Sequence, residues 1–181
     1  MKATNRELID ELIAKTKDVL NQAEELAQLD SETLNKKATP EKWSALECLE
    51  HLNRYGDFYL PEISRCLNGA KKVNENHLFK SSWLGEYFAQ SVSPREKLNK
   101  MNAFKSMNPV GSKLDTKVVG KFIRQQHQML DLLTRARTVD MRKTKTNISI
   151  SKWLTLRMGD TFRVVIYHNQ RHLVQARKAV G

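Results

Sequence analysis

Residues 43–52 read WSALECLEHL, and this stretch has the features that open a long amphipathic helix. Ser44 is followed three residues later by Glu47, the capping-box spacing that is typical of a helix N-terminus. Apolar side chains then recur every three or four residues as far as position 67, which is the period of a helix with one buried face. Pro61 predicts a bend or a break in this helix, and Gly69 predicts its end.

Three other segments show the same apolar period. The first begins near Thr4 or Asn5, either of which can cap a helix, and continues to about residue 27. Another runs from Asp115 or Thr116 to about residue 137, and the last runs from Asp160, its expected cap, to about residue 179. We therefore expect an all-α fold, an antiparallel four-helix bundle, built from a single domain that spans residues 1–181.

The connections between these helices are less regular. Residues 71–114 have a weak apolar period and predict an irregular insertion or flap, with one short helix at about 82–90. A loose segment of this length is either a functional flap or an insertion that only covers the core. Residues 30–42 predict a polar connection, and residues 148–156 predict either a short extended piece or one helical turn.

The chain is basic, with 31 Lys and Arg against 20 Asp and Glu and a formal net charge of +11. These basic residues are scattered along every segment, which favours a solvated basic surface over a face for nucleic acid. Cys48 and Cys66 are too few for a disulfide framework, and we expect both to be buried, inert thiols. The start lacks the apolar core of a signal peptide, and no apolar run approaches the length of a membrane span, so we expect a cytoplasmic protein.

Two histidines, His168 and His172, lie four residues apart on the last helix and therefore project from the same side. On a helical wheel His172 falls near the middle of the apolar stripe and His168 falls on its edge. A buried imidazole needs a polar partner, because an unsatisfied polar group inside a protein is costly. That partner is either a hydrogen bond to another helix or a metal ion.

His51 provides a third imidazole, at the margin of the apolar stripe on the second helix. Side chains from facing helices can share one ion in a bundle core, and three histidines with an open position are typical of a catalytic metal site. The spacing alone leaves open both a shared metal and separately satisfied histidines. The remaining histidines, His77 and His127, are expected at the surface.

Two stretches of the sequence resemble the DinB/YfiT-like family. Residues 43–52 resemble the Trp-Ser…His-Leu segment that opens the second helix of these proteins, and residues 159–175 resemble their last-helix motif His-x-x-x-His-x-x-Gln. The resemblance implies a four-helix bundle that is often a homodimer. It also implies a divalent metal ion such as zinc, nickel or iron, held by His51, His168 and His172. Characterised relatives include transferases and isomerases that use mycothiol, bacillithiol or glutathione.

These features favour a metal-dependent enzyme, specifically a transferase that joins a low-molecular-weight thiol to an electrophilic substrate. Gln175, Tyr55 and Glu47 are candidates for a second shell around the metal, and Arg54 and Arg171 are candidates for attracting an anionic thiol. The sequence assigns no residue a catalytic role. The alternatives are a metal-dependent hydrolase, a non-catalytic protein that binds nucleic acid or a small ligand, and a structural metal that only joins two helices.

Overall fold

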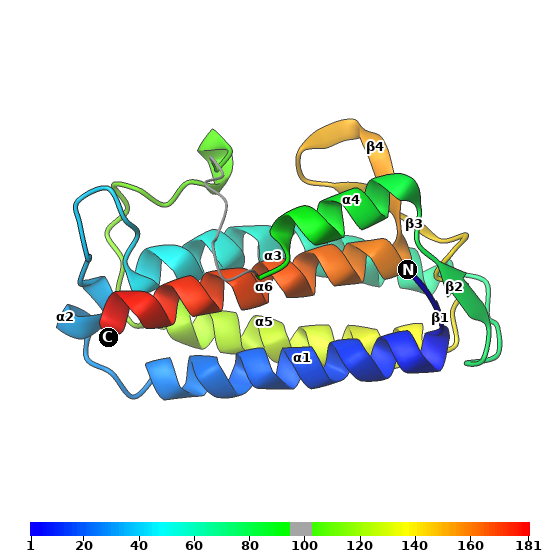
Figure 1. Ribbon diagram of the computed structural model, residues 1–181, viewed down its shortest axis with the longest axis horizontal. Helices are drawn as coiled ribbons and strands as arrows, with labels where there is room; N and C mark the ends of the chain where they lie inside the picture. Colours follow the sequence, from blue (N-terminus) through cyan, green and yellow to red (C-terminus); the bar gives the residue numbers. More distant parts are fainter. Residues whose placement is uncertain (95–102) are drawn as a thin grey trace.

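Four long helices form most of the structure, which is a computed structural model that describes residues 1–94 and 103–181 (Figure 1). They are α1 (Asn5–Leu26), α3 (Ala45–Asn68), α5 (Lys117–Ala136) and α6 (Met158–Val180). The prediction of a mostly helical chain is therefore confirmed. Residues 95–102 of the expected insertion at 71–114 lie outside the described residues.

The chain connections set the direction of each long helix. Strand β1 (Lys2–Thr4), just before α1, pairs with β2 (Leu78–Lys80), which follows α3, so the start of α1 lies near the end of α3. An isolated bridge between Lys72 and Val139 joins the ends of α3 and α5. Helices α1 and α6 thus run in one direction and α3 and α5 in the other (Figure 1). Both α1 and α3 pack against α5 and α6, so the expected antiparallel packing holds for α1 with α5 and for α3 with α6.

Buried apolar side chains form two clusters, one towards each end of the helices. Each long helix passes from one cluster to the other, and each carries buried polar side chains where it does so. Apart from the histidines, these polar side chains are Thr16, Asn53, Gln125, Gln126, Asn169 and Arg171. Several of them bond from one helix to another, for example from the Asn169 amide of α6 to the Gln126 amide oxygen of α5 at 3.1 Å. Because buried polar groups need partners, this layer constrains how the helices align.

The ends of the first two long helices follow their sequence signals. Thr4 with Glu7, and Ser44 with Glu47, form the two capping boxes, and in each pair the backbone and side chain bond reciprocally. Gly69 ends α3 as expected. Pro61 does not break α3, which continues without interruption to Asn68.

Short elements fill the connections. Helix α2 (Ser31–Asn35) lies in the expected polar connection, and α4 (Trp83–Val92) and the 3₁₀ turn η1 (Lys105–Met107) lie in the expected insertion. Strands β3 (Lys145–Ile148) and β4 (Ser151–Arg157) form an antiparallel hairpin, which is the extended one of the two alternatives for this segment. The two small strand pairs were not expected from an all-α prediction.

Asp160 was expected to cap α6, and this expectation is wrong. Helix α6 begins two residues earlier, at Met158, and Asp160 is fully buried in its first turn. Its carboxylate accepts hydrogen bonds from the Ser81 hydroxyl and from both the backbone N–H (3.0 Å) and the hydroxyl (2.9 Å) of Ser82. Ser82 is the N-cap of α4, so Asp160 holds the start of α4 against α6. A Cβ atom at Gly85 would overlap the Asp160 side chain, so only glycine permits this close approach.

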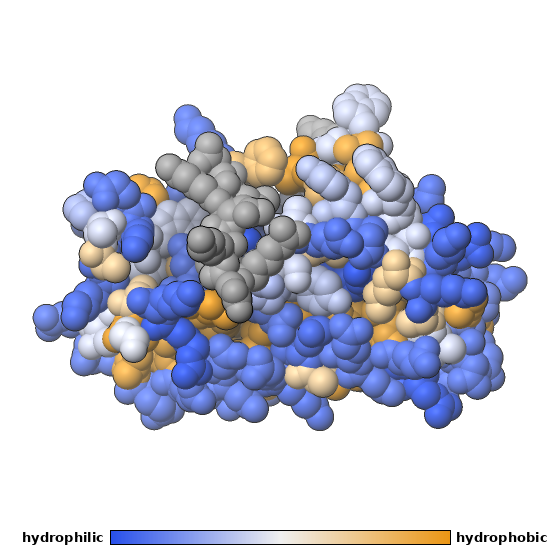
Figure 2. Space-filling view, viewed as in Figure 1, coloured by the Kyte–Doolittle hydropathy of each residue, from blue (hydrophilic) through white to orange (hydrophobic). Residues whose placement is uncertain are grey.

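The surface shown in Figure 2 is mainly hydrophilic, with apolar side chains gathered along its upper edge near the β3–β4 hairpin. Two tryptophans are exposed: Trp83 lies on α4, and Trp153 lies on β4 of the hairpin. None of the described helices combines the length and the apolar character that crossing a membrane requires.

Replacement of Asp160 by Asn should lower the free energy of unfolding by about 1–3 kcal/mol, because the new amide group would face the hydrogen-bond donors of Ser82 in a buried site. Chemical denaturation measures this change. The exposed Asp131→Asn substitution on α5 is the control and should alter stability by less than about 0.5 kcal/mol. Equal effects of the two substitutions would contradict the role given to Asp160.

Candidate metal centre

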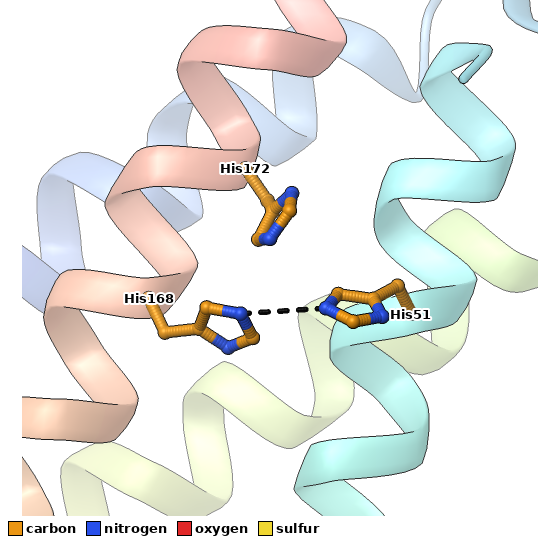
Figure 3. Close-up of side chains that lie close together, drawn as sticks. All are labelled: His51, His168 and His172. Carbon is orange, nitrogen blue, oxygen red and sulfur yellow. Dashed lines mark hydrogen bonds between the residues drawn. The ribbon is translucent and has the colours of Figure 1, made fainter. Parts of the chain in front are cut away.

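Three imidazole rings converge between α3 and α6 (Figure 3). His51 projects from α3, and His168 and His172 project from α6 towards it. Each ring offers one nitrogen as a possible metal ligand, and these three nitrogens all lie within 4.8 Å of one another. The Nε2 atoms of His51 and His168 are 3.3 Å apart. Among the described residues, this is the one group of three or more His, Cys, Asp or Glu side chains close enough to share an ion.

The rings meet because α3 and α6 pack side by side in opposite directions. His168 and His172 occupy successive turns of α6, and His51 lies at the level of α3 that faces them. Their burial reverses the helical-wheel expectation, since His51 is only 3% exposed and His168 and His172 are half-buried. All three histidines line one pocket, but the segment around Met107 also covers His51.

Hydrogen bonds orient two of the rings. The Nδ1–H of His51 donates to the backbone carbonyl of Met107 at 2.7 Å, and the Nδ1–H of His172 donates to Oε1 of Gln175 at 3.0 Å. Since each ring uses Nδ1 as a donor, its Nε2 keeps a lone pair in the neutral tautomer. Outer partners of this kind orient metal-bound histidines in proteins.

The surroundings keep all three rings uncharged. Burial lowers the pKa of His51 from its ordinary value, and burial together with the neighbouring histidines and Arg171 lowers the pKa of His168 well below it. The pKa of His172 falls to about 3, mainly through burial and then through His51 and Arg171. Neutral imidazole is the form that binds a metal ion.

The donor set fits a divalent ion. Two nitrogens that each lie about 2.0–2.1 Å from one tetrahedral ion are about 3.4 Å apart, which is close to the separation of the Nε2 atoms of His51 and His168. In a metal-free site, the same distance allows Nε2–H of His168 to donate to Nε2 of His51. A bound ion uses the lone pairs of all three rings, whereas that hydrogen bond involves only two of them.

The three histidines line a pocket with a volume of about 400 Å³, and we call the part of the pocket that they and the buried Arg171 border its inner end. Side chains from α3, α4, the β3–β4 hairpin and α6 line it, and most of them are aromatic or aliphatic. Arg171 is the only Lys, Arg, Asp or Glu among the described lining residues. It is buried, and it lies between the two histidines of α6 in the sequence.

Two of the residues expected around the site contact the histidines. The ring of Tyr55 meets His51 and His168 edge to face, with centroid distances of 5.0 and 4.8 Å. Burial, with a smaller contribution from Tyr59, raises the pKa of Tyr55 to about 12, so its hydroxyl keeps its proton. Gln175 contacts His172 through the hydrogen bond already described.

Two other expected residues have different partners. Glu47 bonds the backbone N–H of Ser44 at 2.9 Å and Lys37 at 2.8 Å, which is a structural role at the start of α3. The Arg54 guanidinium pairs with Glu50 and donates to the backbone carbonyl of Asn108 at 2.7 Å. Arg54 also contacts the carbonyl of Ser106 and the hydroxyl of Ser112, so it holds the segment that carries the Met107 carbonyl.

Sequence reasoning missed two groups at the site. Trp43 was not among the residues expected at the site, but its ring stacks on His172 (5.8 Å between centroids) and contacts His51 (4.8 Å). Its place in the Trp-Ser motif was a signal that could have found it. The Met107 carbonyl is a backbone group in an irregular segment, and a pattern of side chains in the sequence does not predict its position.

The other histidines and the cysteines lie away from this centre. His77 and His127 are exposed, as expected. Cys48 is buried, and burial raises the pKa of its thiol, which agrees with an inert role. Cys66 was expected to be buried but is only half-buried, next to Glu62 on the outer part of α3.

Comparison with known proteins gives one result. A search of curated proteins and a search of solved structures produced no match. A sequence profile of the DinB superfamily matches residues 12–176, which include all three converging histidines and most of the chain. The chain therefore belongs to the DinB superfamily.

Proposed function

We propose that this protein is a metal-dependent enzyme in which His51, His168 and His172 bind one divalent ion, either zinc, nickel or iron. In this proposal a low-molecular-weight thiol and an electrophilic substrate meet in the adjoining pocket. The observation that carries the proposal is the convergence of three neutral imidazoles at the inner end of a pocket large enough for a small molecule. Three histidine ligands leave a coordination position for a reactant, as in catalytic zinc sites.

A divalent ion bound there would supply Lewis acidity, which lowers the pKa of a thiol or of a water molecule. The chain's own residues have separate tasks. Arg171 places a positive charge beside the site, which favours an anionic sulfur. The Tyr55 hydroxyl keeps its proton, so it can donate a hydrogen bond to an anion in the pocket. The apolar walls exclude water, which would otherwise compete with the thiol as a nucleophile.

The family resemblance supports two further parts of the proposal. We assign the four long helices to the DinB/YfiT-like four-helix bundle, with the helix directions given above. We also infer a homodimer.

Protein purified in its native state should contain about one divalent ion per chain, and single substitutions of His51, His168 or His172 by Ala should reduce this to a small fraction. Elemental analysis of the purified proteins measures the metal content. His127→Ala, at an exposed position on α5, is the matched control and should retain the ion. Full metal content in a His51→Ala, His168→Ala double variant would exclude the site.

The catalytic and structural alternatives differ in whether an added ligand reaches the ion. After replacement of the native metal by cobalt, a low-molecular-weight thiol should change the visible absorption spectrum, because sulfur joins the coordination sphere. Consumption of the thiol should then accelerate when an electrophile is added. A spectrum that no thiol alters, in a protein whose melting temperature falls on metal removal, would instead indicate a structural metal.

Arg54→Gln should weaken metal binding by about tenfold, although Arg54 touches none of the histidines, because the carbonyl that orients His51 would lose its support. Competition with a chelator measures the affinity. Arg65→Gln, which removes an exposed guanidinium paired with Glu62 on the same helix, should have no effect. If Arg54→Gln changed only the apparent affinity for a thiol and left metal affinity intact, Arg54 would be an anion-attracting residue instead.

A further inference from the structure

Four basic residues gather where the two small strand pairs meet. Lys2 of β1 lies opposite Lys80 of β2, and Lys145 of β3 lies opposite Arg157 of β4. The Arg157 guanidinium donates to the backbone carbonyl of Lys80 at 2.6 Å, which joins one pair to the other. Side chains that are directly opposed in an antiparallel pair lie on the same face, so each strand pair brings two cations together. We call these four residues the basic cluster.

The described part of the chain offers the basic cluster no acidic partner. Lys2, Lys80 and Lys145 are exposed, and no described carboxylate pairs with any of the four cations. Glu86, on helix α4, pairs with Arg163 instead. Like charges that are directly opposed in a sheet are destabilising, and both strand pairs contain such an arrangement. An anionic partner would relieve this repulsion in both pairs.

Exposed apolar side chains lie next to the basic cluster. Trp153 and Leu154 on β4 are 93% and 44% exposed, and Ile150 in the hairpin turn is 39% exposed. The hairpin that carries them projects from the helices, with the basic pair of β3 and β4 at its base (Figure 1). Trp83, which is 83% exposed, begins α4 shortly after the end of β2. We call these four residues the apolar rim.

This combination is typical of a surface that lies on a membrane. Tryptophan is enriched at the level of the lipid headgroups, where its ring meets apolar groups and its N–H stays hydrated. Aliphatic side chains reach the boundary of the acyl chains, while Lys and Arg attract anionic lipids. The hairpin has this order, because its apolar side chains lie towards the turn and its cations lie at the base.

Two other partners complement this surface less well. Nucleic acids stack their bases on aromatic rings, but they gain little from exposed aliphatic side chains such as Leu154 and Ile150. A second copy of the chain, related by a two-fold axis, would place two basic clusters in one interface, where their charges would repel each other. A lipid surface accepts the aliphatic side chains as well as the cations.

We propose that the basic cluster and the apolar rim form a docking surface for an anionic lipid membrane. The apolar rim lies among the headgroups, and the basic cluster binds the lipid phosphates. This surface includes none of the three histidines. The inference therefore goes beyond the proposed function and does not depend on it.

Co-sedimentation of the full chain with lipid vesicles tests the proposal. One set of vesicles contains phosphatidylcholine with about 30% phosphatidylglycerol, and the other contains phosphatidylcholine alone. We expect binding to the anionic set to be at least about tenfold tighter than to the neutral set, and to weaken in about 0.5 M salt. The tryptophan emission maximum should shift to shorter wavelength with the anionic set, because Trp83 and Trp153 leave water. Equal binding to both sets, or no binding to either, would overturn the proposal.

Substitutions test each half of the surface. The double variant Lys80→Gln, Lys145→Gln removes one cation from each strand pair and should weaken binding to the anionic vesicles by at least about tenfold. Trp153→Ser should weaken it by about tenfold through loss of apolar contact. Lys17→Gln, Lys178→Gln is the matched control, because it removes the same charge from exposed positions of α1 and α6, and it should weaken binding by less than about threefold. Circular dichroism checks that each variant is folded.

The remaining outcomes identify another kind of binding. If the control double variant lost vesicle binding as completely as Lys80→Gln, Lys145→Gln, binding would come from the net charge of +11, and the basic cluster would not be the site. A gel shift with a single-stranded DNA oligonucleotide tests the nucleic-acid alternative. If the chain bound this oligonucleotide through Lys80 and Lys145 but bound no vesicles, the surface would be a nucleic-acid face and the proposal would be wrong.

Discussion

The buried polar layer between the two apolar clusters is the constraint on which the rest of the structure depends. At this level each long helix replaces apolar side chains with polar groups, and some of these bond across helices: Asn53 of α3 donates to the Val118 carbonyl of α5, and Asn169 of α6 donates to Gln126 of α5. A shift of one helix by a turn would leave those groups buried without partners, at a cost of several kcal/mol for the layer as a whole. The layer thus sets the alignment of α3 with α6. This alignment places His51 opposite His168 and His172 and so creates the site.

The irregular segments complete what the helices begin. The segment held by Arg54 brings the Met107 carbonyl to Nδ1 of His51, while Asp160 fastens the start of α4 to α6. Helix α4 then supplies one aromatic wall of the pocket, and the β3–β4 hairpin supplies another part of it. The region that has the weakest sequence pattern therefore orients the most buried histidine and shapes the space in front of it. The described part of the expected insertion at 71–114 contributes to the site as well as covering the core.

How much of this could be read from the sequence depended on whether the signal was local. The two capping boxes and the apolar period predicted the long helices, because helix ends and buried faces follow from neighbouring residues. The histidine pair on α6 was equally visible. By contrast, the Met107 carbonyl, the partners of Arg54 and the role of Asp160 depend on contacts between distant segments, which no single stretch encodes. The burial of His51 was misjudged for the same reason, since a helical wheel does not include the segments that cover a helix.

The central claim is that three histidines from two helices share one ion. Anomalous diffraction at the absorption edge of the bound metal, from crystals of the protein as purified, tests it most directly. The account predicts a single ion with nitrogen ligands from His51, His168 and His172, at about 2.0–2.1 Å if the ion is zinc. The remaining ligand should be a molecule held in the pocket and not a group of the protein. Crystals of metal-supplemented protein in which Nε2–H of His168 bonds His51 and no ion is present would contradict it.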